Sequence, residues 1–201
     1  IKWFKSDYPK VHLALHQGSP KEIADMLTSG AADVGIATEG LDESPEIATF
    51  PFYRWHHAVI VRKDHPLLRA GAVTLEALSE YPIITYHEGF TGRAHVDKAF
   101  ADAGIVPDIV LSAIDADVIK TYVDLDLGVG IIASMAYDAD KDRNLSLIPV
   151  PELFPSNTTR LAVRRGTYLR SYAYAFIEKV CPDVGEEAVR AALSKQNGSD
   201  S

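Results

Sequence analysis

Cysteine and long apolar runs are both scarce in this chain. Cys181 is the single cysteine among 201 residues, which excludes a disulfide within the chain and a zinc site built on several cysteines. Its neighbours Val180 and Pro182 predict a buried thiol at the end of a helix. No apolar stretch reaches the about 18 residues that a membrane span needs, and no secretory signal is visible. We therefore expect no contact with a membrane.

Basic residues are also few. Lysine and arginine total 20 against 28 aspartates and glutamates, the formal net charge is −8, and no basic cluster exceeds Arg164-Arg165. Nucleic acids are bound through basic patches, so the chain by itself is not expected to bind DNA. Its 47% hydrophobic and 24% charged residues are ordinary for a globular protein with a real core, in one domain or two small lobes.

Motifs of catalysis and metal binding are missing as well. Gly18-Ser19-Pro20 lacks the Gly-x-Ser-x-Gly pattern of a nucleophile elbow. His12 and His16 lie four residues apart, but on a predicted strand, which is a poor geometry for a shared metal. Asp115 and Asp117 fall where a helix start collects acids. We expect no catalytic residue, no metal site, no cofactor and no enzymatic activity.

Alternating strand and helix patterns predict an α/β protein. Ile1 to Tyr8 has the pattern of the last turns of an amphipathic helix without a cap, and we interpret the sequence as a fragment. Next come a predicted strand at Val11–His16, a helix capped by Ser19 and ended by Gly30, and a short strand at Asp33–Thr38, as in a parallel sheet. Further strands are predicted at 57–62, 82–86, 109–113, 128–133, 145–150 and 159–164, and helices at 74–78, 93–103, 117–125, 168–180 and 186–193.

Three predicted helix starts are candidate anion sites, because unpaired N–H groups and a partial positive charge lie there. At the first, Gly18 allows close approach of a ligand, whereas Ser19 and Glu22 form the pattern of an ordinary capping box. At the third, Asp115 or Asp117 caps the helix. A cap and an anion site remain alternatives at both.

The second start, Gly89-Phe90-Thr91-Gly92-Arg93, is more informative. Two glycines around a threonine predict a turn that can close over a ligand, and the Thr91 hydroxyl can donate to an oxyanion. Arg93 could add charge or pair with an acid, and Phe90 could wall a cleft or fill the core. No Gly-Lys-Ser/Thr sequence follows, so the turn is no typical phosphate loop.

Two further places are candidates for ligand contact. Thr38 follows a predicted strand, and open α/β sheets bind ligands at the carboxyl ends of their strands, although a turn hydroxyl can also serve the local backbone. Tyr53 and Trp55 share a face if the chain is extended. They could line a cleft or be core aromatics where the chain crosses between lobes.

Taken together, these motifs resemble the effector-binding domain of LysR-type transcriptional regulators, and most of all the CysB/Cbl group, which controls sulfur assimilation and cysteine biosynthesis. The resemblance covers nearly the whole chain. It rests on 16–20 (HQGSP), 37–39 (ATE), 89–93 (GFTGR), 115–123 (DADVIKTYV) and 127–135 (LGVGIIASM), with Arg165, Thr167 and 169–172 (LRSY) in addition.

The resemblance implies a two-lobed α/β fold like that of type II periplasmic binding proteins, with a ligand cleft between the lobes. Lobe I would comprise residues 1–53 and 159–201, and lobe II residues 54–158. The implied ligand is sulfate or an acetylserine-type inducer. The implied ligand residues are Gly18 and Ser19 as donors, Thr38 and Thr91 as hydroxyls, Gly92 as a backbone N–H, Tyr53, Trp55 and Phe90 as walls, and Asp115 for an inducer amine or as a cap.

Some family features are missing or altered. The family places a Thr/Ser-rich strand that contacts the ligand just before the first helix, and a DNA-binding winged helix-turn-helix upstream of it, and neither is in this sequence. Ile114 stands where some relatives carry a polar residue, and Glu88 adds an acid near the implied anion site. Both could alter the choice of inducer.

The resemblance further implies a cytoplasmic regulator whose domains pair as homodimers, with a homotetramer of the full-length protein. DNA would be bound only through the missing winged helix-turn-helix. The Ile23, Met26 and Leu27 stripe and the Val118 and Tyr122 face are candidate pairing surfaces, or simple core. The alternative is a periplasmic solute-binding protein for a small anion. An enzyme of the same architecture would need a nucleophile or base, and none is convincing.

Overall fold

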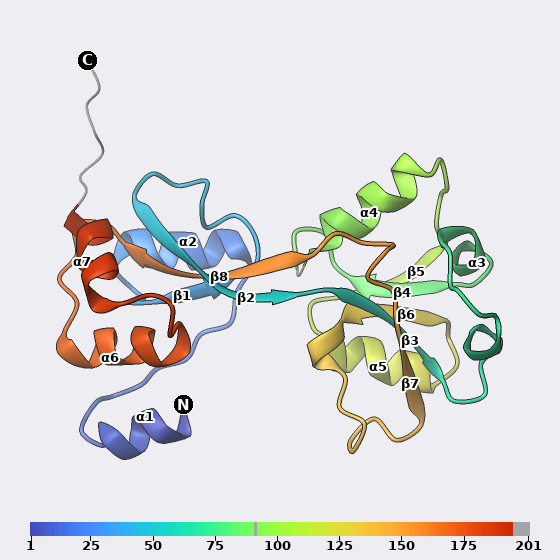
Figure 1. Cartoon of the computed structure of the whole chain (residues 1–201), viewed down its shortest axis with the longest axis horizontal. Coiled ribbons are helices and arrows are strands. Elements are labelled where there is room, and N and C mark those ends of the chain that lie inside the picture. Colours follow the sequence, from blue (N-terminus) through green and yellow to red (C-terminus); the bar gives the residue numbers. More distant parts are fainter. Residues whose placement is uncertain (91, 195–201) are drawn as a thin grey trace. The chain divides into compact units, whose positions relative to one another are not determined.

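The structure of the protein is a computed structural model that describes residues 1–90 and 92–194. The chain divides into two compact units (Figure 1). Unit 1 consists of Ile1–Tyr53 together with the segment that begins at Thr159, and unit 2 is Arg54–Thr158. None of the helices in the described part of the chain is long and apolar enough to cross a membrane.

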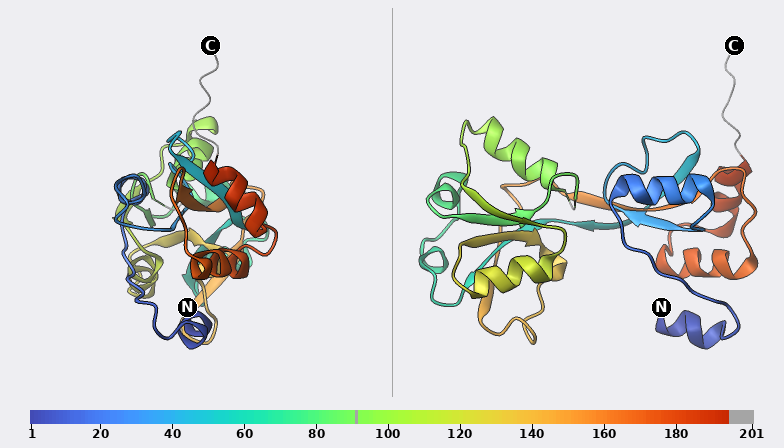
Figure 2. Two further views of the ribbon diagram at one scale, coloured as in Figure 1. Left: turned by 90° about the vertical axis from the view of Figure 1, so that its left-hand side faces the viewer. Right: turned by 180° about the vertical axis from the view of Figure 1, so that it is seen from behind.

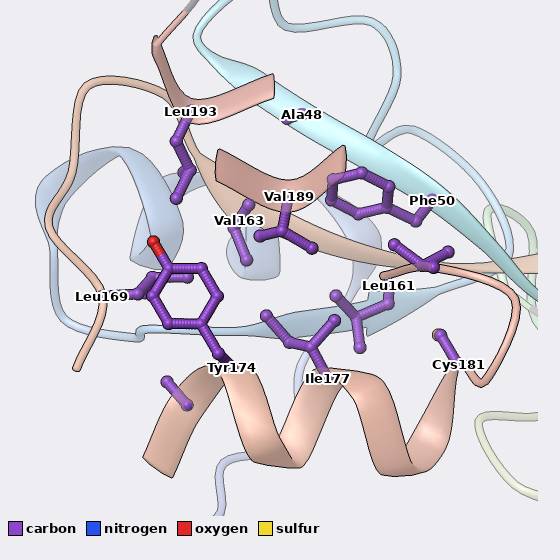
Figure 3. Packing of buried hydrophobic residues seen from close by; sticks show 12 residues of the cluster. Ala48, Phe50, Leu161, Val163, Leu169, Tyr174, Ile177, Cys181, Val189 and Leu193 are labelled. Carbon is purple, nitrogen blue, oxygen red and sulfur yellow. The ribbon is translucent and has the colours of Figure 1, made fainter. Parts of the chain in front are cut away.

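Unit 1 is built on a three-stranded sheet in the order β1-β8-β2, with β1 antiparallel to β8. Its core lies on both faces of this sheet. Leu161 and Val163 pack with the helices α6 and α7 on one face, and Ala162 between them packs with α2 on the other, as strand alternation requires (Figure 3). The elements are α1 (Lys2–Asp7), α2 (Pro20–Ser29), β1 (Gly35–Ala37), β2 (Ile47–Trp55), β8 (Asn157–Arg164), α6 (Ser171–Val180) and α7 (Glu186–Ser194).

The first helix of the chain is held by aromatic side chains. Phe4 is 4% exposed, and its ring lies 5.5 Å from that of Phe176 on α6. Trp3 also stacks on Phe176, at 6.5 Å between ring centroids.

Cys181 follows the C-terminal end of α6 and is buried as expected, and burial raises the pKa of its thiol.

The predicted strand at Val11–His16 is wrong. The segment between Pro9 and Ser19 contains neither helix nor strand, and Leu15 is 70% exposed. A strand is stable only when a neighbouring strand satisfies its backbone N–H and C=O groups, and the described sheet ends at β1. The parallel arrangement expected for the first third of the chain is therefore not formed, and β1 pairs only with antiparallel β8.

Unit 2 is built on a five-stranded mixed sheet in the order β5-β4-β6-β3-β7. Strand β4 is parallel to β5 and β6, while β3 is antiparallel to β6 and β7. The elements are β3 (His57–Arg62), η1 (Pro66–Arg69), α3 (Leu75–Ser79), β4 (Ile83–Tyr86), α4 (Arg93–Asp102), β5 (Ile109–Ala113), α5 (Ala116–Asp124), β6 (Val129–Ala133), η2 (Ser134–Ala136) and β7 (Leu145–Pro149). All five strands predicted in this region are present.

The helices α4 and α5 cover opposite faces of this sheet (Figure 2). Ile83 packs in the cluster that contains Val96 and Phe100 of α4, whereas the next residue, Ile84, packs in the cluster that contains Ile119 of α5. Gly130 lets α5 and β3 approach β6 closely, because a Cβ there would lie 2.5 Å from Ile60. Successive side chains of a strand point to opposite faces of the sheet, so the apolar strands of unit 2 form two cores, one on each face.

Candidate functional site

The N-terminus of α2 is capped by the chain itself. The Ser19 hydroxyl accepts from the Glu22 N–H at 3.3 Å, and the Glu22 carboxylate accepts from the Ser19 N–H at 2.7 Å and from its hydroxyl at 2.9 Å. This confirms the predicted capping box. The bonds from the Ser19 backbone and side chain lower the pKa of Glu22. A carboxylate therefore already lies at this helix start. A Cβ at position 18, where the chain has glycine, would lie 3.1 Å from Oε2 of Glu22.

Thr38 lies at the end of β1 beside a second threonine. Its hydroxyl is 3.3 Å from the hydroxyl of Thr159 on β8, and both groups are partly buried. The register of Ala37 with Arg160 makes these two residues cross-strand neighbours. Thr159 was not among the residues predicted from sequence. Only the pairing of β1 with β8, across more than 100 residues, reveals it.

Tyr53 and Trp55 lie on the same strand, β2, but in different surroundings. Tyr53 is 49% exposed, so its ring is available for a ligand. Trp55 is 2% exposed, and its ring makes an edge contact with His57 at 5.0 Å. Of the two predictions, a residue that lines a cleft or a core aromatic, Trp55 is therefore a core aromatic in this structure.

The turn before α4 carries several of the predicted residues. Gly92 is the N-cap of α4, with a left-handed φ of 70° that favours glycine. Phe90 is partly buried and packs against the cluster under α5, and its ring lies 6.1 Å from that of His87. Glu88 is exposed. Thr91 lies outside the described residues.

Arg93 is a buried structural cation rather than part of an exposed anion site. Its side chain is 7% exposed and pairs with Asp97 at 2.6 Å. Its Nη1 donates to the Tyr86 carbonyl at 2.6 Å and to the Ser112 hydroxyl at 3.4 Å. Of the two alternatives drawn from sequence, pairing with an acid is the one observed. The hydrogen bonds from Arg93 to Tyr86 and Ser112 tie the first turn of α4 to β4 and β5.

Asp115 caps α5. Its carboxylate accepts from the Val118 N–H at 3.0 Å. The cap predicted at Asp115 or Asp117 is thus Asp115, and Asp117 instead pairs with Lys120 at 2.9 Å. This hydrogen bond uses Oδ1, one of the two carboxylate oxygens of Asp115.

A cavity of about 260 Å³ lies beside α5, lined by charged groups of both signs. Its most buried pair is Lys120 with Asp142, whose side chains are 12% and 11% exposed and 3.2 Å apart. Hydrogen bonds from Lys120 to Asp117 and Asp142 outweigh the effect of its burial and raise the pKa of its ammonium group. These charges neutralise one another, and they tie the 136–142 loop to the helix.

The described residues contain no group of three His, Cys, Asp or Glu side chains placed to hold a metal ion. Instead, the predicted ligand residues provide hydroxyls, helix N-termini and aromatic rings in each unit. Such groups bind and orient small anions.

Comparison with known proteins identifies the family. Residues 1–180 match the family described as "LysR substrate binding domain". The chain is 53% identical to the transcriptional regulator SsuR of Burkholderia cenocepacia over 96% of its own length and 63% of that protein. It is 50% identical to CysB of the same organism, over 96% of this chain and 62% of that protein. With Cbl of Escherichia coli it shares 46%, over 89% of this chain and 56% of that protein.

A solved structure gives the same result. The cofactor-binding domain of the Cbl transcriptional regulator superposes with a TM-score of 0.93 at 42% identity, over 97% of this chain and 86% of that one. This confirms the predicted α/β fold of the periplasmic-binding-protein type. The chain spans about 60% of the length of the curated relatives, which are named transcriptional regulators and not enzymes. The chain therefore belongs to the family of LysR substrate-binding domains.

Proposed function

We propose that this chain is the effector-sensing part of a cytoplasmic LysR-type regulator of sulfur assimilation and cysteine biosynthesis. The observation that carries the proposal is the 46–53% identity with SsuR, CysB and Cbl over nearly the whole chain. None of these three relatives is named a solute-binding protein, which disfavours the periplasmic alternative.

The proposed ligand is sulfate or an acetylserine-type anion. Unit 1 contributes the Gly18-Ser19 helix start, the Thr38 hydroxyl and the exposed ring of Tyr53. Unit 2 contributes the turn of Phe90, Thr91 and Gly92, with Trp55 as a buried aromatic support. The second oxygen of Asp115 would accept from an inducer amine. The ligand would transmit a signal by binding two states of the domain with different affinity.

Two features of the site bear on ligand choice. The Glu22 carboxylate already accepts hydrogen bonds from the N–H and the hydroxyl of Ser19. An anion can accept from these two groups only if their hydrogen bonds to Glu22 break. The Thr38 and Thr159 hydroxyls lie 3.3 Å apart, so one of them donates to the other and does not offer that proton to a ligand. The site would thus favour ligands that need few side-chain donors.

Isothermal titration calorimetry with sulfate, thiosulfate, O-acetylserine and N-acetylserine tests the proposal. It would use this chain and a version extended upstream of Ile1 by the Thr/Ser-rich strand that the family resemblance implies. Thr38→Ala and Thr91→Ala should each weaken binding about tenfold, since one charge-assisted hydrogen bond contributes about 1.5 kcal/mol. Thr121→Ala is the matched control, because that hydroxyl donates to the Asp117 carbonyl within α5. Binding unchanged in both test variants would contradict the site.

Homodimerisation is proposed through α2 and α5, with DNA bound only by a winged helix-turn-helix upstream and a homotetramer in the full-length protein. The exposed apolar residues near α5 support a pairing surface there: Val118 is 38% exposed, Ile114 55% and Leu125 63%. On α2, Leu27 is fully buried and belongs to the core, which leaves Ile23 and Met26, both partly buried. Sedimentation velocity of Val118→Lys against the unmodified chain measures this directly.

A further inference from the structure

A buried polar pair lies beside the start of α4 in unit 2. Asn157 and His57 are each 1% exposed, and the Asn157 amide nitrogen is 3.3 Å from Nδ1 of His57. Since an amide nitrogen can only donate, the imidazole Nδ1 accepts. The His57 ring makes edge contacts with Trp55 at 5.0 Å and Phe154 at 5.6 Å. The pair is therefore enclosed by aromatic side chains.

The other end of the Asn157 side chain is not satisfied. Within the described part of the chain, its Oδ1 is buried and has no hydrogen-bond partner. It points at Gly92, where a Cβ would collide with it. A buried amide oxygen without a donor destabilises the folded state, and native proteins rarely keep one without a reason. The oxygen adjoins the N-terminus of α4, a helix of ten residues.

We infer that Asn157 is a further ligand-binding residue of the proposed effector site, and that its Oδ1 accepts a hydrogen bond from the effector. This inference rests on the proposed function. The helix N-terminus offers N–H donors to an acidic group, and Asn157 adds an acceptor beside them. Together they select an organic anion that carries an N–H or O–H donor close to its acidic group. Sulfate at neutral pH has no such donor.

Oδ1 is enclosed, so an effector reaches it only if the groups around it move, and Gly92 at the start of α4 is the group that it faces. Gly89 and Gly92 both have positive φ, and a Cβ at Gly89 would meet nothing within 4 Å. Gly92 itself presents no side chain to the Asn157 carboxamide. An effector that donates to Oδ1 would therefore satisfy this oxygen and, at the same time, hold the start of α4 in place.

The test compares Asn157→Leu, which has similar volume and no polar atoms, with the unmodified protein and with Asn144→Leu. Asn144 is the control because its amide makes an exposed hydrogen bond to Asp124 at 3.3 Å. Affinities for N-acetylserine, O-acetylserine and sulfate are measured by calorimetry in whichever form of the chain binds in the titrations above. Melting temperature is measured in parallel without ligand.

Asn157→Leu should weaken binding of the acetylserines at least tenfold and change sulfate affinity less than twofold. Its melting temperature should fall modestly, because the variant removes the donor to the buried Nδ1 of His57. The selective loss of acetylserine binding separates a binding role from a structural one, because a structural residue would lower the affinities for all ligands together. Equal losses for all ligands, a loss confined to sulfate, or no loss at all would overturn the inference. If the unmodified protein binds none of the three, the proposed function itself fails.

Discussion

The ion pair between Lys120 and Asp142 provides a strong test of how the 136–142 loop is held. The Lys120 ammonium contacts four oxygens: Oδ1 of Asp117 at 2.9 Å, both carboxylate oxygens of Asp142 at 3.2 Å and the Ala136 carbonyl at 3.0 Å. Lys120→Met keeps most of the aliphatic stem but leaves the Asp142 carboxylate, 11% exposed, without a cation. Breaking a buried pair by removing one partner costs about 3 kcal/mol. For a chain of this size the melting temperature should fall by about 6–12 °C.

Thermal unfolding followed by circular dichroism measures this change, and two variants control it. Lys98→Met removes an exposed pair with Asp102, in which the side chains are 70% and 64% exposed, and should cost no more than about 0.5 kcal/mol. Lys120→Met combined with Asp142→Leu removes both charges and should recover much of the lost stability. A melting temperature for Lys120→Met equal to that of Lys98→Met would refute the reasoning, as would a double variant no more stable than the single one.

Three further predictions concern the candidate ligand residues. Hydrogen bonds from Ser19 lower the pKa of Glu22 from its usual value of 4.5 in the folded state. The ionised carboxylate therefore stabilises the folded state above that pH, and this stabilisation is lost as the pH falls through the folded-state pKa. Between pH 6 and pH 3, the melting temperature of Glu22→Gln should therefore fall less than that of the unmodified protein. The same variant should bind sulfate more tightly in calorimetry, because a competing carboxylate is gone. Gly92→Ala should lower the free energy of unfolding, measured by chemical denaturation, more than Gly89→Ala does. Both variants lose about 1–2 kcal/mol because alanine is disfavoured at positive φ, but only the Cβ at position 92 collides with Asn157. Equal costs would show that the carboxamide does not pack against the turn.

Local patterns were the most predictable part of the fold. The Ser19 and Glu22 capping box and a cap at Asp115 or Asp117 were predicted from residues within four positions of one another; the box is present, and Asp115 is the cap. The strands of unit 2 were read from their apolar composition, since a buried strand of a mixed sheet is apolar on both faces. Val11–His16 has the same apolar pattern but is not a strand, because strand formation also needs a partner in the sheet.

What the sequence by itself determined was therefore the α/β class, most helix and strand positions, the caps, and the motifs that the LysR family shares. Only the tertiary structure decided which side chains are available for a ligand. It buries Trp55 and the Arg93 guanidinium, leaves Tyr53 half-exposed, and brings Thr159 to Thr38 and Asn157 to His57. These last contacts join residues about 100 or more positions apart, and no local periodicity encodes them, because they depend on how strands far apart in the chain lie side by side.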